Sequence, residues 1–368
     1  MKITVIGCGN GAFATAAELS SRGYEITLYV QEKHRDNFDA IRENKIIMCK
    51  GKGPNGPVKI HKITHDVEVA MKDPDLIIPV LPSFAHEDVA KTIAPYIKKE
   101  SKVFLSPGST GGALVFAKVF RDFGKLEGVK LAEVHTLPYT ARRFGENGVN
   151  ITLITKVMYF AAFPAKYNQE MYDLIHSIYP NIQLMTDCLE TGLNNGNGTT
   201  HPAPVILNAG KIEYYGKHYH YKEGITPSVG NVVQLIDDER KKICHALGYQ
   251  EIDIKDRLYQ MGYCPRKDTV YECIQGSKEI FLPLEGPNDL NGRYLTEDGP
   301  YTLVCMASLA QAIGIKTPLM ESVVNLAGAL KGEDYWSIGR TLDKIGLQGM
   351  SIDQIRTYLQ EGYNGRFS

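Results

Sequence analysis

Short apolar runs alternate with longer amphipathic runs through the first half of the chain. The apolar runs are rich in Ile, Val, Leu and Phe and end at Gly or Pro, which is typical of buried strands. They predict strands at residues 3–6, 25–30, 76–81, 102–105, 131–134 and 157–162. Helical patterns lie between several of them, at residues 13–21, 84–97 and 113–120. This alternation predicts an α/β domain with a doubly wound, mostly parallel sheet that is covered by helices on both faces.

The second half of the chain carries helix-start signals instead of strand runs. Two Thr-Pro pairs, at residues 226–227 and 317–318, place proline at the first helical position after an N-cap. Ser351 and Gln354 have the spacing of a capping box. Apolar residues at helical spacing follow these signals, so we predict that this half is all-α.

Length and composition then set the domain organisation and exclude some partners. A chain of 368 residues is too long for one simple core, so we predict two domains, 1–186 and 187–368. The net charge of −1, without a long basic block, argues against a nucleic acid or an anionic membrane as partner. No run approaches the length of a membrane span. The seven cysteines are scattered without a CxxC pair, which indicates reduced thiols in a cytoplasm and no metal site.

A glycine-rich turn, GCGNGA at residues 7–12, joins the first predicted strand to the first predicted helix. Gly7 permits the tight turn, Gly9 lets the backbone approach a pyrophosphate, and Ala12 keeps helix and strand close. The amino end of the helix offers unpaired N–H groups to the anion. The alternative is a plain tight turn. We predict a dinucleotide site at Gly7, Gly9, Asn10, Gly11 and Ala12.

The residues after the second predicted strand bear on the choice of cofactor. NAD selection usually needs an acid at the end of this strand, but Gln31 stands there and Glu32 comes late. Lys33 and Arg35 follow and suit a 2′-phosphate, which favours NADP(H), with NAD(H) as the alternative. A solvated surface run is the simpler explanation for these charges.

Two further loops follow predicted strands. Leu81, Pro82 and Ser83 come after the strand at 76–81, where the carboxyl end of a strand borders the cofactor in folds of this type. Gly108 opens a glycine-rich loop after the strand at 102–105, and we predict that it lies beside the nicotinamide. A flexible turn is the alternative for Gly108.

One histidine stands apart from the other nine. His201 lies between a Gly/Asn run and two prolines, in NGNGTTHPAP, and Pro202 biases it away from helical geometry. A residue at such a helix break is suited to face a cleft, and an imidazole moves protons near neutral pH. The pattern alone leaves a packed or surface histidine equally open.

The whole chain resembles the opine dehydrogenase family, which includes octopine, nopaline and N-(1-carboxyethyl)amino acid dehydrogenases. The resemblance rests on VIGCGNGAFATAAELSSRGY at the cofactor turn, FLSPGSTGGALVF in the middle, NNGNGTTHPAPVILNAG around the histidine, and EGPNDLNGRYLTEDGP. These segments occur in family order and cover nearly the full length. The histidine segment together with the NGRYLTED segment is the most specific part.

The resemblance implies an N-terminal Rossmann domain, an all-helical C-terminal domain and an active site in the cleft between them. It implies that an L-amino acid and a 2-oxo acid, pyruvate by default, condense to an imine that NAD(P)H reduces. The catalytic histidine corresponds to His201, its aspartate partner to Asp298, and the arginine that binds a substrate carboxylate to Arg293. A carboxylate next to the imidazole would orient it and stabilise its charged form.

Several alternatives stay open at this point. The helix that starts after Thr226 and includes Ser228 is suited to a substrate carboxylate, although an ordinary N-cap explains it too. A carbonyl reductase acting on a 2-oxo acid or a glycerol phosphate without any amine is the nearest rival enzyme. A non-catalytic dinucleotide sensor is a rival of another class. The sequence leaves the amino acid unknown, and a homodimer is compatible with the helical half but not required by it.

Overall fold

The computed structural model describes residues 1–363, apart from the side chains of residues 36–38 and 40. The chain forms two compact units, which we call unit 1 and unit 2. Unit 1 contains Met1–Gly108, Gly112–Cys188 and the chain from Tyr358, whereas unit 2 contains Ser109–Gly111 and Leu189–Thr357. The predicted domains, 1–186 and 187–368, stay a prediction, because a compact unit is not by itself an independently folding domain. Residues 364–368 of the second predicted domain lie outside the described residues.

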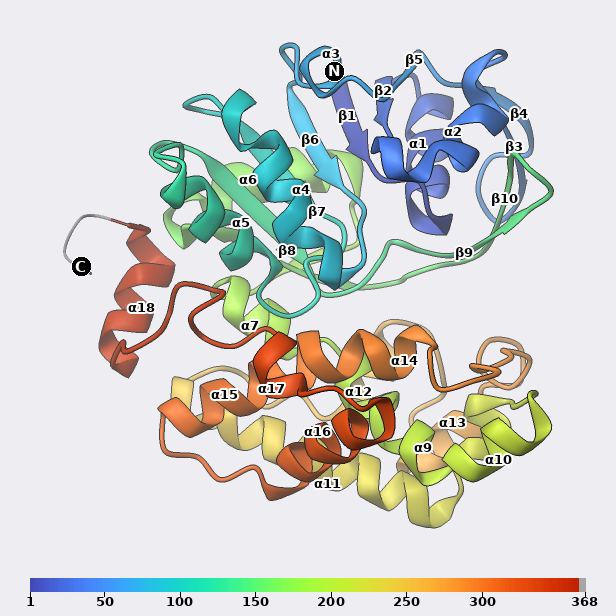
Figure 1. The fold of residues 1–368 in the computed structure, drawn as a ribbon, viewed down its shortest axis with the longest axis vertical. Coiled ribbons are helices and arrows are strands. Elements are labelled where there is room, and N and C mark those ends of the chain that lie inside the picture. The colour runs from blue at the N-terminus through green and yellow to red at the C-terminus, as the bar shows by residue number, and fades with distance from the viewer. Residues whose placement is uncertain (364–368) are drawn as a thin grey trace. The chain divides into compact units, whose positions relative to one another are not determined.

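Unit 1 is built on an eight-stranded sheet in the order β12-β11-β8-β7-β6-β1-β2-β5. Figure 1 labels its strands β8, β7, β6, β1, β2 and β5. All neighbouring strands are parallel except β11, which runs antiparallel to β8. The central strands are buried throughout, because helices cover the sheet; β6 and β11 are almost wholly apolar, whereas β8 also buries Lys130 and Glu133. The strands are β1 (Lys2–Ile6), β2 (Glu25–Tyr29), β5 (Lys62–Thr64), β6 (Leu76–Pro79), β7 (Lys102–Leu105), β8 (Lys130–Val134), β11 (Met158–Phe163) and β12 (Ile182–Leu184).

The helices of unit 1 connect these strands, and α5 and α6 pack directly on β8 and β11. The α-helices are α1 (Asn10–Ser21), α2 (Arg35–Arg42), α3 (Val67–Ala70), α4 (His86–Ile93), α5 (Gly112–Asp122) and α6 (Asn168–Ile178). Short 3₁₀ turns are η1 (Glu32–His34), η2 (Ser83–Ala85), η3 (Ala94–Tyr96) and η4 (Ala165–Tyr167). The mostly parallel sheet with helical connections confirms the predicted fold class for this part of the chain.

A second, four-stranded sheet in unit 1 was not predicted. Its order is β4-β3-β10-β9, with β3 (Ile46–Gly51), β4 (Gly56–Lys59), β9 (Tyr139–Phe144) and β10 (Gly148–Ile154). It packs on α1, which also contacts β1 and β2 of the main sheet (Figure 1). Because α1 is covered on two sides, most of its residues are buried, and its alanines allow the close approach.

Unit 2 is helical, as predicted, and α11 is its longest helix at 21 residues. Its α-helices are α7 (Cys188–Leu193), α8 (Asn197–Thr200), α9 (Pro202–Leu207), α10 (Ala209–Tyr215), α11 (Pro227–Leu247), α12 (Ile254–Gln260), α13 (Val270–Gln275), α14 (Arg293–Thr296), α15 (Val304–Ala312), α16 (Pro318–Lys331) and α17 (Tyr335–Ile338). Two π-helical turns are η5 (His220–Gly224) and η6 (Gly299–Leu303), and α18 (Ile352–Glu361) is the last helix described. Within residues 1–363, no helix combines the length and apolarity that crossing a membrane needs.

The predicted helix starts differ in how their caps are made. Thr226 is the N-cap of α11 and its hydroxyl accepts a hydrogen bond from the Val229 N–H at 3.4 Å. Ser351 and Gln354 form both bonds of a capping box before α18. Thr317 is the N-cap of α16, but its hydroxyl donates to the Glu321 carboxylate at 3.3 Å instead of capping the backbone.

Candidate active site

The glycine-rich turn of unit 1 has a backbone that only glycine accommodates at its first position. Gly7 has φ +138°, and a Cβ atom there would lie 2.5 Å from the carbonyl oxygen of Val80. Its N–H donates to the carbonyl oxygen of Tyr29 at 3.0 Å, which ties the turn to the end of β2. Any side chain at this position would therefore push β1 away from the chain that follows β6.

The amino end of α1 fits a pyrophosphate. Gly9 is the N-cap of this 12-residue helix, no side chain caps the first-turn N–H groups, and no atom lies within 4 Å of a Cβ placed on Gly9. An open backbone with uncapped N–H groups is what an anion requires here. The Asn10 side chain is used differently, since its Oδ1 accepts from the Arg143 N–H of β9 at 2.8 Å. Gly11 and Ala12 pack closely, against Val80 and Gly7 respectively.

Two of the residues predicted to select the cofactor, Gln31 and Lys33, are hydrogen-bonded to Asp88, an acid that the sequence did not mark for the site. Gln31 Nε2 and Lys33 Nζ both donate to Oδ2 of Asp88, at 3.0 and 2.8 Å. Arg35 pairs with Glu32 at 3.5 Å, and its side chain is 63% exposed. Asp88 lies within α4, and no signal in its helical pattern marks it as a neighbour of β2. The cations are therefore available at the surface but partly neutralised.

The loops after β6 and β7 both follow parallel strands of the main sheet, and their predicted contacts with the cofactor stay a prediction. Leu81, Pro82 and Ser83 follow β6, which is the parallel neighbour of β1, so the loops after both strands share one edge of the sheet. The sheet order reverses direction between β6 and β1, which is the usual place for a dinucleotide. Gly108 is confined beneath its loop, because a Cβ there would lie 2.1 Å from Oε2 of Glu133.

His201 lies at the break between two short helices of unit 2. It is the C-terminal cap of α8 and the N-cap of α9, with φ −107° and ψ −61°. Pro202 occupies the first position of α9, where its missing N–H costs nothing. The imidazole is 8% exposed.

Both ring nitrogens of His201 are hydrogen-bonded within unit 2. Nδ1 lies 2.7 Å from Oδ2 of Asp298, which sits between α14 and η6. Nε2 lies 2.8 Å from the hydroxyl oxygen of Tyr221, which belongs to η5. The ring of Tyr294 stacks on the imidazole, with centroids 3.7 Å apart and planes at 6°. The packing of α9 against α14 and η5 brings these residues together.

Burial governs the protonation of the His201–Asp298 pair. It lowers the pKa of the His201 imidazolium to about 3, because a charged ring loses hydration there. Burial, and next the carboxylate of Glu297, raise the pKa of Asp298 well above its usual value. Burial is the largest cause of both shifts, because it disfavours a charge on either partner. We therefore regard the pair as one group that holds a single proton between Nδ1 and Oδ2.

Arg293 is close to this pair in sequence but is turned toward solvent. Its side chain is 66% exposed, and its Nε donates to the buried carboxylate of Glu297. The positive charge of Arg293 opposes the upward shift of the Asp298 pKa. Its predicted contact with a substrate carboxylate stays a prediction, and the exposed guanidinium is accessible for one.

The other predicted substrate residues, Thr226 and Ser228, are exposed at the amino end of α11. The Thr226 hydroxyl accepts from a backbone N–H, so it already acts as an ordinary cap. From the sequence, Tyr221 was only a weak candidate to line the site and Tyr294 was not selected, although both contact the imidazole. The only available signal for Tyr221 was the run of rings HYHY at 218–221, and no spacing rule connects it to His201.

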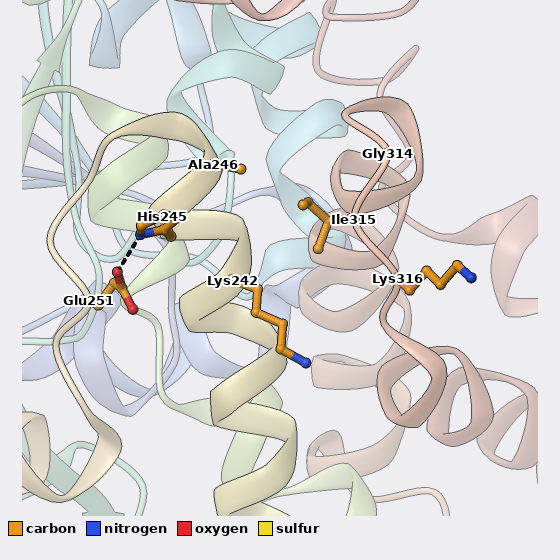
Figure 2. Close-up of a pocket in the computed structure, with 7 residues that line it drawn as sticks. All are labelled: Lys242, His245, Ala246, Glu251, Gly314, Ile315 and Lys316. Atoms are coloured by element: carbon orange, nitrogen blue, oxygen red, sulfur yellow. Dashed lines mark hydrogen bonds and ion pairs between the residues drawn. The ribbon is translucent and has the colours of Figure 1, made fainter.

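A surface pocket of unit 2 contains none of the predicted site residues. The pocket lies between the carboxyl end of α11 and the segment that joins α15 to α16, and Figure 2 shows the residues that line it. The lining residues are Lys242, His245, Ala246, Glu251, Gly314, Ile315 and Lys316. His245 is 79% exposed and pairs with Glu251 at 2.7 Å, so neither group is desolvated as His201 is. Among the residues that the structure describes, no cluster of three metal-binding side chains occurs.

Comparison with known proteins adds independent findings. Residues 184–331 match the family described as NAD/NADP octopine/nopaline dehydrogenase, alpha-helical domain, and residues 2–110 match the NAD-dependent glycerol-3-phosphate dehydrogenase N-terminus. An opine dehydrogenase of Arthrobacter sp. (strain 1C) is 34% identical, over 97% of this chain and 98% of that protein. The octopine dehydrogenase of Pecten maximus is 25% identical, over 99% and 97%.

Solved structures share the fold of the chain. A structure of octopine dehydrogenase with NADH and L-arginine has a TM-score of 0.79 at 20% identity and covers 99% of both chains. Yersinopine dehydrogenase with NADP⁺ has a TM-score of 0.74 at 16% identity and covers 98% of both chains. The Rossmann domain and the helical domain, predicted from pattern and resemblance, are thereby confirmed as the fold class.

Proposed function

The chain belongs to the opine dehydrogenase family, and on this premise we propose that it couples an L-amino acid to a 2-oxo acid, with pyruvate as the default. The amine and the carbonyl condense to an imine, and reduction at the expense of NAD(P)H gives an N-(carboxyalkyl)amino acid. The observation that carries this proposal is the buried His201–Asp298 pair, in which Nδ1 and Oδ2 lie 2.7 Å apart. A dinucleotide-binding protein without proton chemistry has no need of such a pair.

In unit 1, the dinucleotide would be held by the glycine-rich turn, the amino end of α1 and the loops after β6 and β7. Gly7 and Gly9 give the backbone room for the pyrophosphate, and the amino end of α1 supplies N–H groups. The loop 81–83 and Gly108 follow strands at the same edge of the sheet. When bound, the reduced nicotinamide supplies the hydride for the imine carbon.

In unit 2, His201 would move the proton that imine formation requires. The carbinolamine loses water when its oxygen receives a proton, and the imidazole is the source of that proton. Asp298 accepts the Nδ1 hydrogen bond, fixes the ring and stabilises its charge while the proton is in transit. Arg293 presents an exposed guanidinium that suits a substrate carboxylate in two parallel hydrogen bonds.

The test follows cofactor absorbance with purified protein. Oxidation of NAD(P)H should require both a 2-oxo acid and an amino acid, and a panel of amino acids with pyruvate should identify the amine. The variant His201→Ala should lower kcat at least about 100-fold, the usual contribution of a general acid–base group. Amine-independent oxidation would favour a simple carbonyl reductase, and cofactor binding without any turnover would favour a sensor.

For the cofactor we propose a preference for NADPH over NADH. The support is the pair of cations, Lys33 and Arg35, both exposed just after β2, with no acid at the end of the strand itself. Asp88 opposes this preference by pairing with Lys33. The ratio of kcat/KM for the two cofactors measures it: Asp88→Asn should raise the ratio toward NADPH, and the double variant Lys33→Ala/Arg35→Ala should lower it. A ratio that neither variant changes would contradict the proposal.

We also propose a cytoplasmic location, which the cysteines support. All seven cysteines, each within the described residues, are free thiols and none forms a disulfide, as expected in a reducing compartment. A homodimer remains compatible with the helical unit, and light scattering of the purified protein would decide between monomer and dimer.

A further inference from the structure

The imidazole of His201 has no ring nitrogen left for a substrate. Nδ1 is bonded to Asp298 at 2.7 Å, and Nε2 is bonded to the hydroxyl of Tyr221 at 2.8 Å. With the Nδ1 proton directed at Asp298, the neutral ring accepts at Nε2, and the Tyr221 hydroxyl is the donor. A proton that passes between this ring and a substrate must therefore be transferred through the Tyr221 hydroxyl, unless the Tyr221 side chain first moves away from Nε2.

Tyr221 is held too firmly to leave easily. Its side chain is buried, and its ring stacks on Phe281 with centroids 4.3 Å apart and planes at 21°. Its carbonyl oxygen accepts from Nε2 of Gln275 at 3.1 Å, which anchors the backbone of η5 to α13. The hydroxyl is thus fixed against Nε2 by packing on one side and by a backbone anchor on the other.

The hydroxyl also has the hydrogen-bonding capacity that a relay needs. A phenol oxygen has two lone pairs and one proton. The hydroxyl of Tyr294 bonds to that of Tyr221, and its ring, stacked on His201, lies over the same site. A protonated Nε2 fills one of the two lone pairs, so the Tyr221 proton is no longer needed by the imidazole and is available for another acceptor. Burial raises the pKa of Tyr221 well above its usual value, so the phenol stays neutral between transfers.

We propose that the Tyr221 hydroxyl relays the proton between Nε2 of His201 and the substrate; this inference rests on the proposed function. In the forward direction, the neutral ring first receives, through Tyr221, the proton that the ammonium group of the amino acid loses before its nitrogen attacks the carbonyl. Tyr221 then gives its proton to the carbinolamine oxygen and takes the Nε2 proton of the imidazolium so formed. The C–O bond breaks, water leaves, and the nitrogen lone pair forms the C=N bond. Tyr221 ends neutral, and His201 ends as the neutral ring bonded to Asp298. Tyr221 is then the group that touches the reacting oxygen.

The test compares Tyr221→Phe with Tyr263→Phe in the full-length protein. Both variants remove one hydroxyl from a ring that packs on Phe281, but Tyr263 is not bonded to the imidazole, whose two nitrogens are already accounted for. We expect Tyr221→Phe to lower kcat about 100-fold with little change in the KM of the 2-oxo acid, and Tyr263→Phe to leave kcat near the wild-type value. In mixtures of H₂O and D₂O, the wild-type rate should depend on deuterium content with the curvature of two moving protons, and that of Tyr221→Phe should be linear.

A kcat for Tyr221→Phe that equals or exceeds the wild-type value would overturn the relay, because Tyr221 would then be only a gate or a packing residue. An unchanged curvature in the deuterium series would overturn it as well. Nitrogen-15 NMR of the histidine rings provides a readout without turnover: the Nε2 resonance of His201 should shift in Tyr221→Phe and stay in Tyr263→Phe. If the wild type shows no amine-dependent turnover, the proposed function fails, and an unshifted Nε2 resonance would still reject the relay separately.

Discussion

Two buried aspartates of unit 2 have opposite protonation behaviour. Asp237, on α11, is 0% exposed, and Asp298, after α14, is 6% exposed. Burial by itself raises the pKa of both carboxyl groups, because it removes water from the charged form. The pKa of Asp237 nevertheless ends below its ordinary value, whereas that of Asp298 ends well above it. The difference lies in the neighbours of each carboxylate, not in the degree of burial.

Asp237 is surrounded by permanent positive charge. Arg240, one turn along α11, donates its Nε to Oδ1 at 2.7 Å, and Arg257 of α12 donates to the same oxygen. The N–H of Ile254 donates to the other oxygen at 2.8 Å. Two guanidiniums and a backbone donor outweigh the loss of water and keep the carboxylate ionised. This cluster therefore fixes α12 onto α11.

Asp298 faces a neutral imidazole and the repulsion of an adjacent acid, and the positive charge of Arg293 opposes its upward pKa shift only in part. Its partner His201 stays neutral because burial disfavours the imidazolium, and Glu297 disfavours a second negative charge next to it. Such a carboxyl group changes its proton content in response to its surroundings, whereas Asp237 does not. The comparison teaches that a saturated buried charge serves the structure, and an unsaturated one is available for proton transfer.

The largest effect should follow from removing the charge of Asp237. The variant Asp237→Asn keeps the volume but leaves Arg240 and Arg257 buried without an anion, which typically costs about 3–5 kcal/mol of unfolding free energy. Urea denaturation followed by circular dichroism measures this loss. Asp73→Asn is the matched control, since Asp73 pairs with Lys98 at 2.6 Å on the surface with 70% exposure, and it should leave the midpoint unchanged. Equal midpoints for the two variants would contradict the structural role of Asp237.

Asp298→Asn should lower the activity of the protein without lowering its stability, in contrast to Asp237→Asn. We expect a kcat at least about 100-fold lower, equivalent to roughly 2.7 kcal/mol of barrier, because the amide cannot stabilise the imidazolium. Its unfolding free energy should not fall, since the substitution removes a carboxyl group for which ionisation in the folded state is unfavourable. Steady-state kinetics and urea denaturation on one preparation test both halves. A loss of stability comparable to that of Asp237→Asn would show that the two aspartates do not differ as described.

The smallest effect is a difference in how stability varies with pH. The lowered pKa of Asp237 contributes stability that is present above the unfolded pKa of about 3.9 and is lost as pH falls toward its folded pKa. The raised pKa of Asp298 contributes stability that is present below about 3.9 and is lost as pH rises through its folded pKa. Each group changes the slope by at most about 1.4 kcal/mol per pH unit.

Urea denaturation from pH 3 to pH 8 of the wild type and both Asn variants would resolve these slopes. Relative to the wild type, Asp298→Asn should become progressively more stable as pH rises above about 4. Asp237→Asn should lose less stability than the wild type as pH falls below about 4. Parallel curves for all three proteins would remove the basis of the comparison.

Local patterns in the sequence were sufficient for the frame of unit 1. The buried strands, the turn at Gly7 and the capped start of α11 each depend on a few adjacent residues, so short-range rules identified them. The second sheet escaped prediction because β3 pairs with β10 about a hundred residues later, and short strands rich in Gly and Lys carry little periodic signal. The partner of Lys33 escaped for the same reason, since Asp88 is distant in sequence.

The sequence by itself determined the two-part organisation, the glycine turn and, through family resemblance, the pairing of His201 with Asp298. Only the tertiary structure decided the state of that pair, because the pKa of a carboxyl group depends on the water, charges and donors that folding places around it. It also decided that the Tyr221 hydroxyl is hydrogen-bonded to Nε2 of His201, and that the exposed side chain of Arg293 pairs with Glu297. Such contacts join residues from separate helices, and no periodicity along the chain encodes which atoms will meet across the packed interior.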